Sequence, residues 1–376
     1  MNTKVTVLLA VHNGEPYVRE AVESVLSQTF TDFEFVIVDD ASTDGTAGIV
    51  ESFDDDRIRV LRNERKLGQV PSLNRGLAEA RGEYVARIDH DDRCRAERLA
   101  EQVAVLDSQP EVGLVGTWLD LVDERGRKVG RLRSTIADFP EFVFHTLIMR
   151  VYISHPAAMY RREPVLALSG YDESAGPAED KDLWRRLMLD RWDARIVPKP
   201  LVVYRLHAAQ LSQTRAEYQR DVDGRSQERL LSSLAPQSPV HGLRLLLAND
   251  PACWGKDADE ALRALELVLL GARSRLRLTA DEAQRLDGLV AQRLVEVAAA
   301  RPWRRSARRL AAYGLRRLPV GRRPRAAAFL ALEPLRELLR RSVRGAAHMP
   351  GLRALRAPAK RSRLVRRLYG RLLGGG

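Results

Sequence analysis

Apolar runs and helical patterns alternate along the first 120 residues of the chain. The runs are short and rich in Val, Ile and Leu, and they lie at 5–11, 33–38, 58–61, 83–88 and 112–116. Between them apolar residues recur at helical spacing, which predicts helices that begin near Pro16, Ser42, Ser72 and Arg98. Strands that are apolar throughout are typical of a parallel sheet buried on both faces. The pattern predicts an α/β fold with a mostly parallel sheet and helices on both faces.

The pattern changes after residue 120, where residues 123–128 predict a turn. Further strands are expected at 151–160 and at 194–206, the second as one or two strands broken by prolines, with a helix at 180–189 between them. Beyond residue 212 the periodicity is wholly helical, most clearly at 261–272 and 286–300. We therefore expect an α/β body at 1–212, a helical region at 213–300 and an Arg-rich tail at 301–376.

Charge is distributed very unevenly along the chain. The 376 residues include 62 Lys and Arg against 50 Asp and Glu, a net charge of +12. Residues 301–376 alone hold 22 basic and two acidic residues, so the tail carries +20 and the first 300 residues carry −8. An acidic body with a basic tail is typical of a protein whose chemistry and whose contact with an anionic surface are separate.

The tail has two interpretations that the sequence leaves open. Segments 329–344 and 364–373 place leucines at helical spacing with arginines beside them. Such amphipathic helices lie on anionic membranes, but they also pack as helical subdomains with solvated arginines. Nucleic acid is a less favoured partner, because only four aromatic residues interrupt the basic residues of the tail.

The two cysteines and the hydropathy of the chain indicate the cellular compartment in which we expect the protein. Cys94 and Cys253 have no metal-binding spacing and are interpreted as reduced thiols. The apolar stretch at 5–11 predicts a buried strand rather than a signal segment, and no run has the length to span a bilayer. The expected location is the cytoplasm, with peripheral contact to the inner face of the membrane as a hypothesis for the tail.

Polar residues gather where three predicted strands end. Asp89, Asp91 and Asp92 follow the strand at 83–88, Asp39 and Asp40 end the strand at 33–38, and His12 and Asn13 follow the strand at 5–11. Each group could simply cap a helix or form a turn. Their joint position at one sheet edge instead favours a ligand site, where carboxylates hold a hard divalent cation against a diphosphate.

Five segments, taken in order, resemble the family 2 glycosyltransferases with a GT-A fold. They read VTVLLAVHNGEPYVREAVESVLSQTFTDFEFVIVDDASTDGT at 5–46, NRGLAEARGEYVARIDHDD at 74–92, HPAAMYRRE at 155–163, AEDKDLWRRL at 178–187 and YRLHAAQLS at 204–212. The resemblance covers about residues 3–212 and implies inverting transfer of a sugar from a nucleotide-diphosphate donor. A QxxRW pattern is absent after the ED pair, which favours transfer of single sugars over processive synthesis.

The resemblance also implies roles for individual residues at the donor site. Asp40 would accept the N–H of a uracil base, and Asp89 would contact the ribose or the water shell of a metal. The remaining donor contacts implied are Ala10, His12, Asn13, Glu15, Asn74 and Arg87. The family usually has Tyr at the position of His12, so stacking on the base is not carried over.

Metal and catalytic roles follow from the same resemblance. Asp89 and Asp91 match the DxD motif, with Asp91 as ligand to Mg²⁺ or Mn²⁺. His207 is a further candidate for the metal or diphosphate, with a solvated loop histidine as the alternative. Glu179 and Asp180 match the ED motif, and Asp180 is the expected base that deprotonates the acceptor. The alternative is that both acids merely favour a helix N-terminus.

These implications together predict a metal-dependent transferase that uses a nucleotide sugar. The expected acceptor is a glycan or a lipid-linked hydroxyl compound, in cell-surface polysaccharide or glycolipid synthesis. Two alternatives come from other classes of protein. One is an inactive relative that binds nucleotides and acts as an interaction protein, and the other is an anion-binding protein that contacts nucleic acid through its basic tail.

Overall fold

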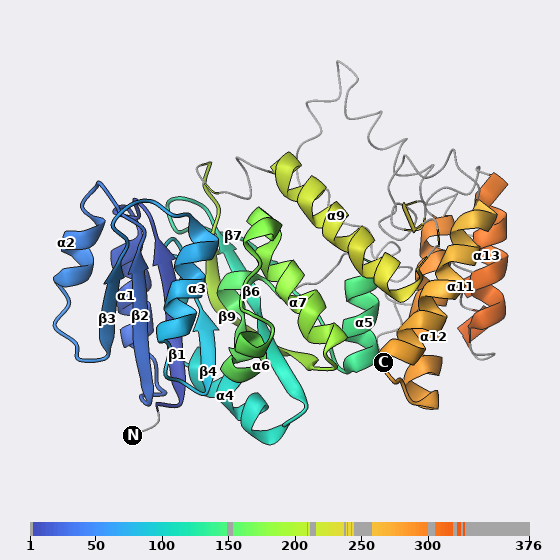
Figure 1. Ribbon diagram of the computed structural model, residues 1–376, viewed down its shortest axis with the longest axis horizontal. Coiled ribbons are helices and arrows are strands. Elements are labelled where there is room, and N and C mark those ends of the chain that lie inside the picture. Colours follow the sequence, from blue (N-terminus) through green and yellow to red (C-terminus); the bar gives the residue numbers. More distant parts are fainter. Residues whose placement is uncertain are drawn as a thin grey trace, which may run out of the picture.

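A computed structural model describes most of the chain outside the tail. The described residues are 3–148, 153–208, 210, 216–236, 238, 240–241, 243, 258–299, 305–318, 322–324 and 326–327. They form a nine-stranded mixed sheet in the order β3-β2-β1-β4-β8-β6-β9-β5, with β7 paired to β6, followed by a group of helices (Figure 1).

The first half of the sheet is parallel, as expected. Its strands and connecting helices are β1 Val5–Val11, α1 Val18–Leu26, β2 Phe33–Asp39, α2 Thr46–Glu51, β3 Ile58–Arg62, α3 Gln69–Glu79 and β4 Tyr84–Arg87. Helix α2 begins later than Ser42, because Ala41 has φ 55° and the Ser42 N–H is bonded to Asp39 in a turn. Helix α3 begins earlier than Ser72, directly after Gly68, whose φ of 104° suits glycine.

The second half of the sheet is mixed, so the expectation of a mostly parallel sheet holds only as far as β4. Strand β8 runs antiparallel to β4 and β6, β5 antiparallel to β9, and β7 antiparallel to β6, while β6 and β9 are parallel. A tight hairpin such as β6–β7 can only join antiparallel strands. The elements are β5 Arg93–Cys94, α4 Arg98–Ser108, β6 Val112–Val122, β7 Lys128–Leu132, α5 Phe139–Leu147, η1 His155–Ala157, β8 Met159–Arg161, α6 Arg162–Ala167, η2 Glu173–Ala178, α7 Glu179–Leu189 and β9 Asp193–Arg205.

Proline shapes two strands of this half. The strand predicted at 151–160 is wrong in extent, since the chain forms the 3-10 turn η1 around Pro156 and β8 begins only at Met159. Strand β9 is continuous through Pro198 and Pro200. Its pairing with β6 shifts register between Thr117 and Trp118, opposite these prolines. Proline has no N–H group to donate to a neighbouring strand, and both prolines lie where the pairing is irregular.

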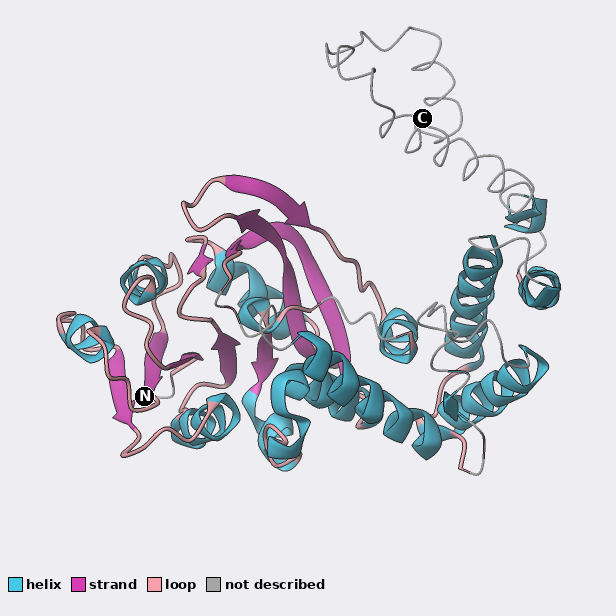
Figure 2. Ribbon diagram, turned by 90° about the horizontal axis from the view of Figure 1, so that it is seen from above, coloured by secondary structure: helices cyan, strands magenta, loops and turns pink. Residues whose placement is uncertain are grey.

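Two apolar layers cover the sheet, one on each face. Val7 and Leu9 of β1 pack with α1, α2 and α4, whereas Leu8 of the same strand packs with α3, α5 and α7. Viewed from above, helices lie on both sides of the row of strands (Figure 2). Alternate side chains along a strand therefore pack into two separate cores, one on each face of the sheet. This confirms the expected α/β class with helices on both faces.

The helical region continues the core of the α/β body. The helices are α9 Ala216–Leu234, α11 Ala258–Arg275, α12 Ala280–Ala299 and α13 Arg305–Arg317. Helix α11 contains the segment predicted at 261–272, and α12 contains the segment predicted at 286–300 as far as Ala299. Apolar side chains of α9, α11 and α12 join the cluster that also holds Phe142 and Trp184. The amphipathic segments 329–344 and 364–373 lie outside the described residues. Within the described part of the chain, no helix combines the length and apolar character needed to cross a membrane.

Candidate active site

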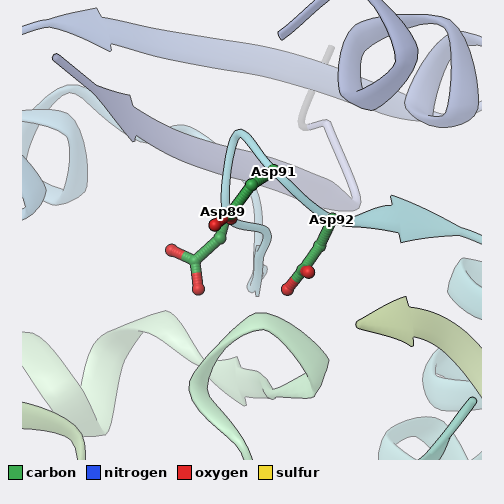
Figure 3. A group of neighbouring side chains, drawn as sticks. All are labelled: Asp89, Asp91 and Asp92. Atoms are coloured by element: carbon green, nitrogen blue, oxygen red, sulfur yellow. The ribbon is translucent and has the colours of Figure 1, made fainter. Parts of the chain in front are cut away.

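Three carboxylates meet in the loop between β4 and β5. Asp89, Asp91 and Asp92 each offer one oxygen, and these oxygens lie within 4.8 Å of one another. Figure 3 shows the three side chains leaving the same short loop with their carboxylates gathered together. The strand β4 brings this loop to the carboxyl edge of the parallel half, as the sequence predicts.

Asp92 is the most deeply buried of the three, with 1% of its surface exposed. Its Oδ1 accepts the backbone N–H of Arg205 at 2.9 Å, while its Oδ2 is buried without a hydrogen-bond partner. Burial and the charges of Asp91 and Asp89 raise the pKa of Asp92 well above its ordinary value. Crowded carboxylates with an orphaned oxygen suit a hard divalent cation, which takes oxygen ligands and offsets their repulsion. The residues therefore fit the expected Mg²⁺ or Mn²⁺.

Arg87 fixes the orientation of Asp89. The Arg87 side chain is fully buried, and its Nη2 donates to Asp89 Oδ1 at 2.6 Å. Burial by itself would raise the pKa of Asp89, but the neighbouring positive charges, led by Arg87, together hold that pKa below its ordinary value. Arg87 thus reaches the site through Asp89, and a contact with the donor remains a prediction.

A histidine from the end of the sheet completes this group. Nε2 of His207, just beyond β9, lies 2.8 Å from Asp91 Oδ2. The His207 side chain is only 10% exposed, so the alternative of a solvated loop histidine is wrong. The ring of Tyr17 packs against the His207 ring with centroids 5.3 Å apart.

Arg205 is a site residue that the sequence analysis missed. Its buried guanidinium donates to the Asp91 carbonyl at 3.1 Å and to Glu20 Oε2 at 2.9 Å, and it lies 4.6 Å from the centre of the Tyr17 ring. The sequence signal that could have identified Arg205 was its position at the end of a strand, two residues before His207. Arg205 joins α1, β9 and the acidic loop.

The loops after β1 and β2 are bonded to each other, which brings the predicted nucleoside contacts together. His12 Nδ1 lies 2.9 Å from the Asp40 carbonyl, and Asn13 Oδ1 accepts the Thr43 N–H at 2.8 Å. Glu15 Oε2 accepts the Gly45 N–H at 2.8 Å. Ala10 lies next to them, near the end of β1.

Asp40 holds the loop that leads into α3. Its oxygens accept the N–H groups of Leu67 and Gly68, each at 2.8 Å, and the Asn63 amide at 2.7 Å. Burial raises the pKa of Asp40, but these bonds together lower it below its ordinary value. The resemblance implies that Asp40 also accepts a uracil N–H. That hydrogen bond would use an Asp40 oxygen that already accepts an N–H group of the protein.

Asn74 makes its bonds away from the acidic loop. Its amide donates to the Tyr171 carbonyl and accepts the Tyr171 N–H, both at 2.8 Å. This pair of bonds ties α3 to the turn at Gly170, where φ is 68°. The structure gives Asn74 a positioning function, and its predicted donor contact stays a prediction.

Glu179 and Asp180 begin α7, directly after η2. Asp180 Oδ1 accepts the N–H of Lys181 at 2.7 Å. Burial raises the pKa of Asp180 above its ordinary value, and the neighbouring charge of Glu179 adds to this. A carboxylate with increased proton affinity is better suited to take a proton from a hydroxyl group.

A buried chain of hydrogen-bonding groups faces Glu179. Tyr160 and Tyr171 hydroxyls lie 3.0 Å apart, the Tyr171 hydroxyl lies 2.9 Å from His155 Nε2, and His155 Nδ1 lies 3.5 Å from Glu179 Oε1. An ionised carboxylate can only accept hydrogen bonds. The four groups can therefore all be satisfied if each one donates to the next in the direction of Glu179. The sequence analysis gave His155 no such role, because only the fold brings η1 to α7.

Comparison with known proteins agrees with this geometry. The family description "Glycosyl transferase family 2" matches residues 6–168. An uncharacterised glycosyltransferase of Methanocaldococcus jannaschii is 30% identical over 206 residues, which are 54% of this chain and 70% of that protein. The chain belongs to glycosyltransferase family 2.

Other relatives of this family 2 glycosyltransferase have more specific descriptions. The putative glycosyltransferase EpsE of Bacillus subtilis is 34% identical over 49% of this chain and 66% of its own length. WbnJ of Escherichia coli, an O-antigen biosynthesis glycosyltransferase, is 28% identical over 54% of this chain and 80% of its own length. The chain thus spans slightly less than two thirds of EpsE.

A solved structure confirms the GT-A fold of this glycosyltransferase. Residues 1–349 of S. aureus TarS, in complex with UDP-GlcNAc, superpose with a TM-score of 0.52 at 20% identity, over 83% of this chain and 90% of that one. Asp180 and His207 lie beyond the family match, which ends at residue 168. The position of His207 therefore rests on its contact with Asp91, and the assignment of Asp180 to the site stays a prediction.

Proposed function

We propose that this glycosyltransferase moves a single sugar, with inversion, from a nucleotide-diphosphate donor to a hydroxyl acceptor. UDP is the proposed nucleotide, which the UDP-GlcNAc complex of TarS supports by analogy. The proposed acceptor is a glycan or lipid-linked compound of cell-surface polysaccharide or glycolipid synthesis. WbnJ supports this context, since it is described as an O-antigen biosynthesis glycosyltransferase.

One observation carries the proposal, namely a run of contacts that joins the acidic loop to the ED pair through β4 and η1. Arg87, whose side chain binds Asp89, donates its backbone N–H at 2.9 Å to the Ala158 carbonyl directly after η1. Within η1, His155 Nδ1 lies 3.5 Å from Glu179 Oε1. The acidic loop and the ED pair therefore belong to one site, which separates a diphosphate-binding part from a proton-accepting part.

A divalent cation, when bound, would supply positive charge that stabilises the departing diphosphate. Asp91, Asp89 and His207 are the proposed residues that hold it. Asp92 contributes a further carboxylate beside them. The protein's own part is to fix these side chains, with Arg87 orienting Asp89 and His207 contacting Asp91.

Asp180 is the proposed general base. Its raised pKa favours uptake of the proton from the acceptor hydroxyl as that oxygen attacks the anomeric carbon. The hydroxyl oxygen bonds to the anomeric carbon while the bond from that carbon to the diphosphate breaks, so the configuration inverts. The N–H of Lys181 orients one oxygen of Asp180 and leaves the other for the acceptor.

The proposed location is the cytoplasmic face of the membrane, with the basic tail 301–376 in peripheral contact with anionic lipid. The described part of the tail supports this with exposed Arg309 and Arg316 on α13. Basic residues near an anionic bilayer each contribute about 1 kcal/mol.

Thermal unfolding with UDP, GDP, dTDP and CDP, each with and without Mn²⁺, tests the donor proposal. A ligand at 100 times its dissociation constant stabilises by about 2.7 kcal/mol. We expect a Mn²⁺-dependent rise in Tm with UDP. A folded protein that responds to none of the four nucleotides would contradict the proposed function and favour an inactive relative.

A further inference from the structure

The hairpin formed by β6 and β7 is the feature that carries a further inference. Strand β7 pairs with β6 and, among the described strands, with no other, so it lies at an outer position of the sheet. The turn is fixed by Asp123, whose carboxylate accepts the N–H groups of Arg125 and Arg127 at 3.0 and 2.9 Å. The hairpin is therefore an ordered surface element.

Apolar side chains are exposed on this element. Val129 is 58% exposed and Leu132 is 36% exposed, and both belong to the five residues of β7. The pairing with β6 passes from Gly130 to Lys128, so Val129 is the extra residue of a bulge, and this places it on the same face of the strand as Leu132. Exposed apolar side chains that share a face and are rimmed by polar groups are typical of interaction sites.

Basic residues are frequent along the same hairpin. Residues 120–133 hold five basic side chains, Arg125, Arg127, Lys128, Arg131 and Arg133, against three acidic ones. Lys128 and Arg131 pair with the buried Asp120, and Arg127 pairs with Asp123. A net charge of +2 remains on the hairpin, in a body whose first 300 residues carry −8.

The hairpin also touches the candidate active site. The Glu124 carbonyl accepts from Arg205 Nη1 at 3.2 Å, and Glu124 Oε1 accepts the Ala208 N–H at 3.4 Å. Arg205 and His207 both contact Asp91. Whatever binds the hairpin is therefore placed beside the acidic loop.

We propose that the β6–β7 hairpin docks on an anionic lipid bilayer, with Val129 and Leu132 entering the interface and the basic side chains contacting lipid phosphates. Apolar residues among basic ones are the pattern that anionic interfaces bind. Residues 123–133 contain no aromatic side chain on which a nucleic acid base could stack. Strand addition by a second copy is disfavoured, because it would bring like charges on β7 together.

Only the biological use of this docking rests on the proposed function, because the docked protein would receive a lipid-linked acceptor at Asp91 and Asp180. The binding surface itself is independent of catalysis. It also differs from the tail proposal, because it places a membrane contact on the catalytic body.

A local fluorescent probe tests the docking without interference from the basic tail. In the full chain with Cys253→Ser, Val129→Cys is labelled with an environment-sensitive fluorophore, while Cys94 is buried. Vesicles of phosphatidylglycerol are expected to shift the emission to the blue, and phosphatidylcholine vesicles are not. Leu132→Cys is a second labelling position, and Leu166→Cys, 40% exposed on α6, is the matched control without a shift.

The outcomes separate the possible contacts. Adding Arg125→Glu and Arg127→Glu is expected to abolish the shift at position 129. Protein that sediments with phosphatidylglycerol vesicles while both hairpin probes stay silent would overturn the proposal, as would a shift with duplex DNA but not with vesicles. Thermal unfolding of the labelled protein with UDP and Mn²⁺ reports the proposed function separately, so either proposal can fail alone.

Discussion

His207 Nε2 lies 2.8 Å from Oδ2 of Asp91, although 116 residues separate them in the chain. The contact joins the end of β9 to the acidic loop after β4, and it places an imidazole beside three carboxylates. A His nitrogen next to clustered carboxylates suits a transition metal such as Mn²⁺ as well as the harder Mg²⁺.

His207→Ala is expected to weaken Mn²⁺-dependent binding of UDP by about 10-fold or more, because a ligand or its close partner is lost. Titration by calorimetry with and without Mn²⁺ measures this loss. His241→Ala is the matched control, since His241 is exposed and pairs with Glu228. Equal nucleotide affinity in His207→Ala and the control would exclude His207 from the metal site.

Asp92→Asn is expected to raise the Tm of the metal-free protein and to reduce the further rise that Mn²⁺ gives. The substitution removes one of three crowded charges, while the amide oxygen can still accept the Arg205 N–H. Thermal unfolding with Mn²⁺ and with a chelator measures both effects. A lower metal-free Tm would show that Asp92 is stabilising in the absence of a cation.

Asp180→Asn is expected to lower kcat by about 100-fold or more while leaving UDP binding intact, because general bases contribute on that scale. Asp190→Asn, exposed at the other end of α7, is the control with the same chemical change. Single-turnover rates and UDP titrations separate the two effects. Near-normal turnover in Asp180→Asn would remove it as the base.

The pH dependence of kcat/KM also tests the assignment of Asp180 as the base. A base must be deprotonated, so kcat/KM falls as the pH falls through the pKa of Asp180, which burial and Glu179 raise. Glu179→Gln removes the neighbouring negative charge and is expected to move this acidic limb to lower pH. A limb that does not move in Glu179→Gln would assign it to another group.

Tyr171→Phe is expected to lower the free energy of unfolding by about 1–3 kcal/mol, because buried Tyr160 and His155 each lose a partner. The change should also reduce kcat, since His155 is no longer oriented toward Glu179. Urea unfolding and turnover measure these effects, with exposed Tyr218→Phe as control. Unchanged stability would mean that the hydroxyl chain is not formed.

A buried ion pair joins the catalytic helix to the helical region. Arg185 of α7 pairs with Asp223 of α9, and Lys181 Nζ lies 2.7 Å from the same carboxylate. Asp223→Ala is expected to cost about 3–5 kcal/mol, because it leaves the Arg185 charge buried and unpaired. Exposed Asp221→Ala is the control in urea unfolding, and equal losses in both variants would contradict a buried pair.

The parallel half of the fold could be predicted from the sequence because its signals are local. Each buried strand is a continuous apolar run, and parallel strands direct their carboxyl ends to one edge. The meeting of Asp89, Asp91 and Asp92 follows from this, since all three lie within five residues after β4. The basic tail segments at 329–344 and 364–373 remain predictions.

The rest depended on tertiary structure, because its contacts join residues far apart in sequence. Strands β5 and β8 are two and three residues long, too short for a period to identify them. The burial of His207 against Asp91, the stacking of Arg205 over the Tyr17 ring and the approach of His155 to Glu179 all follow from how β9, η1 and α7 pack. The sequence alone determined which chemical groups the chain carries at its strand ends, and the packing of distant elements decided which of them meet.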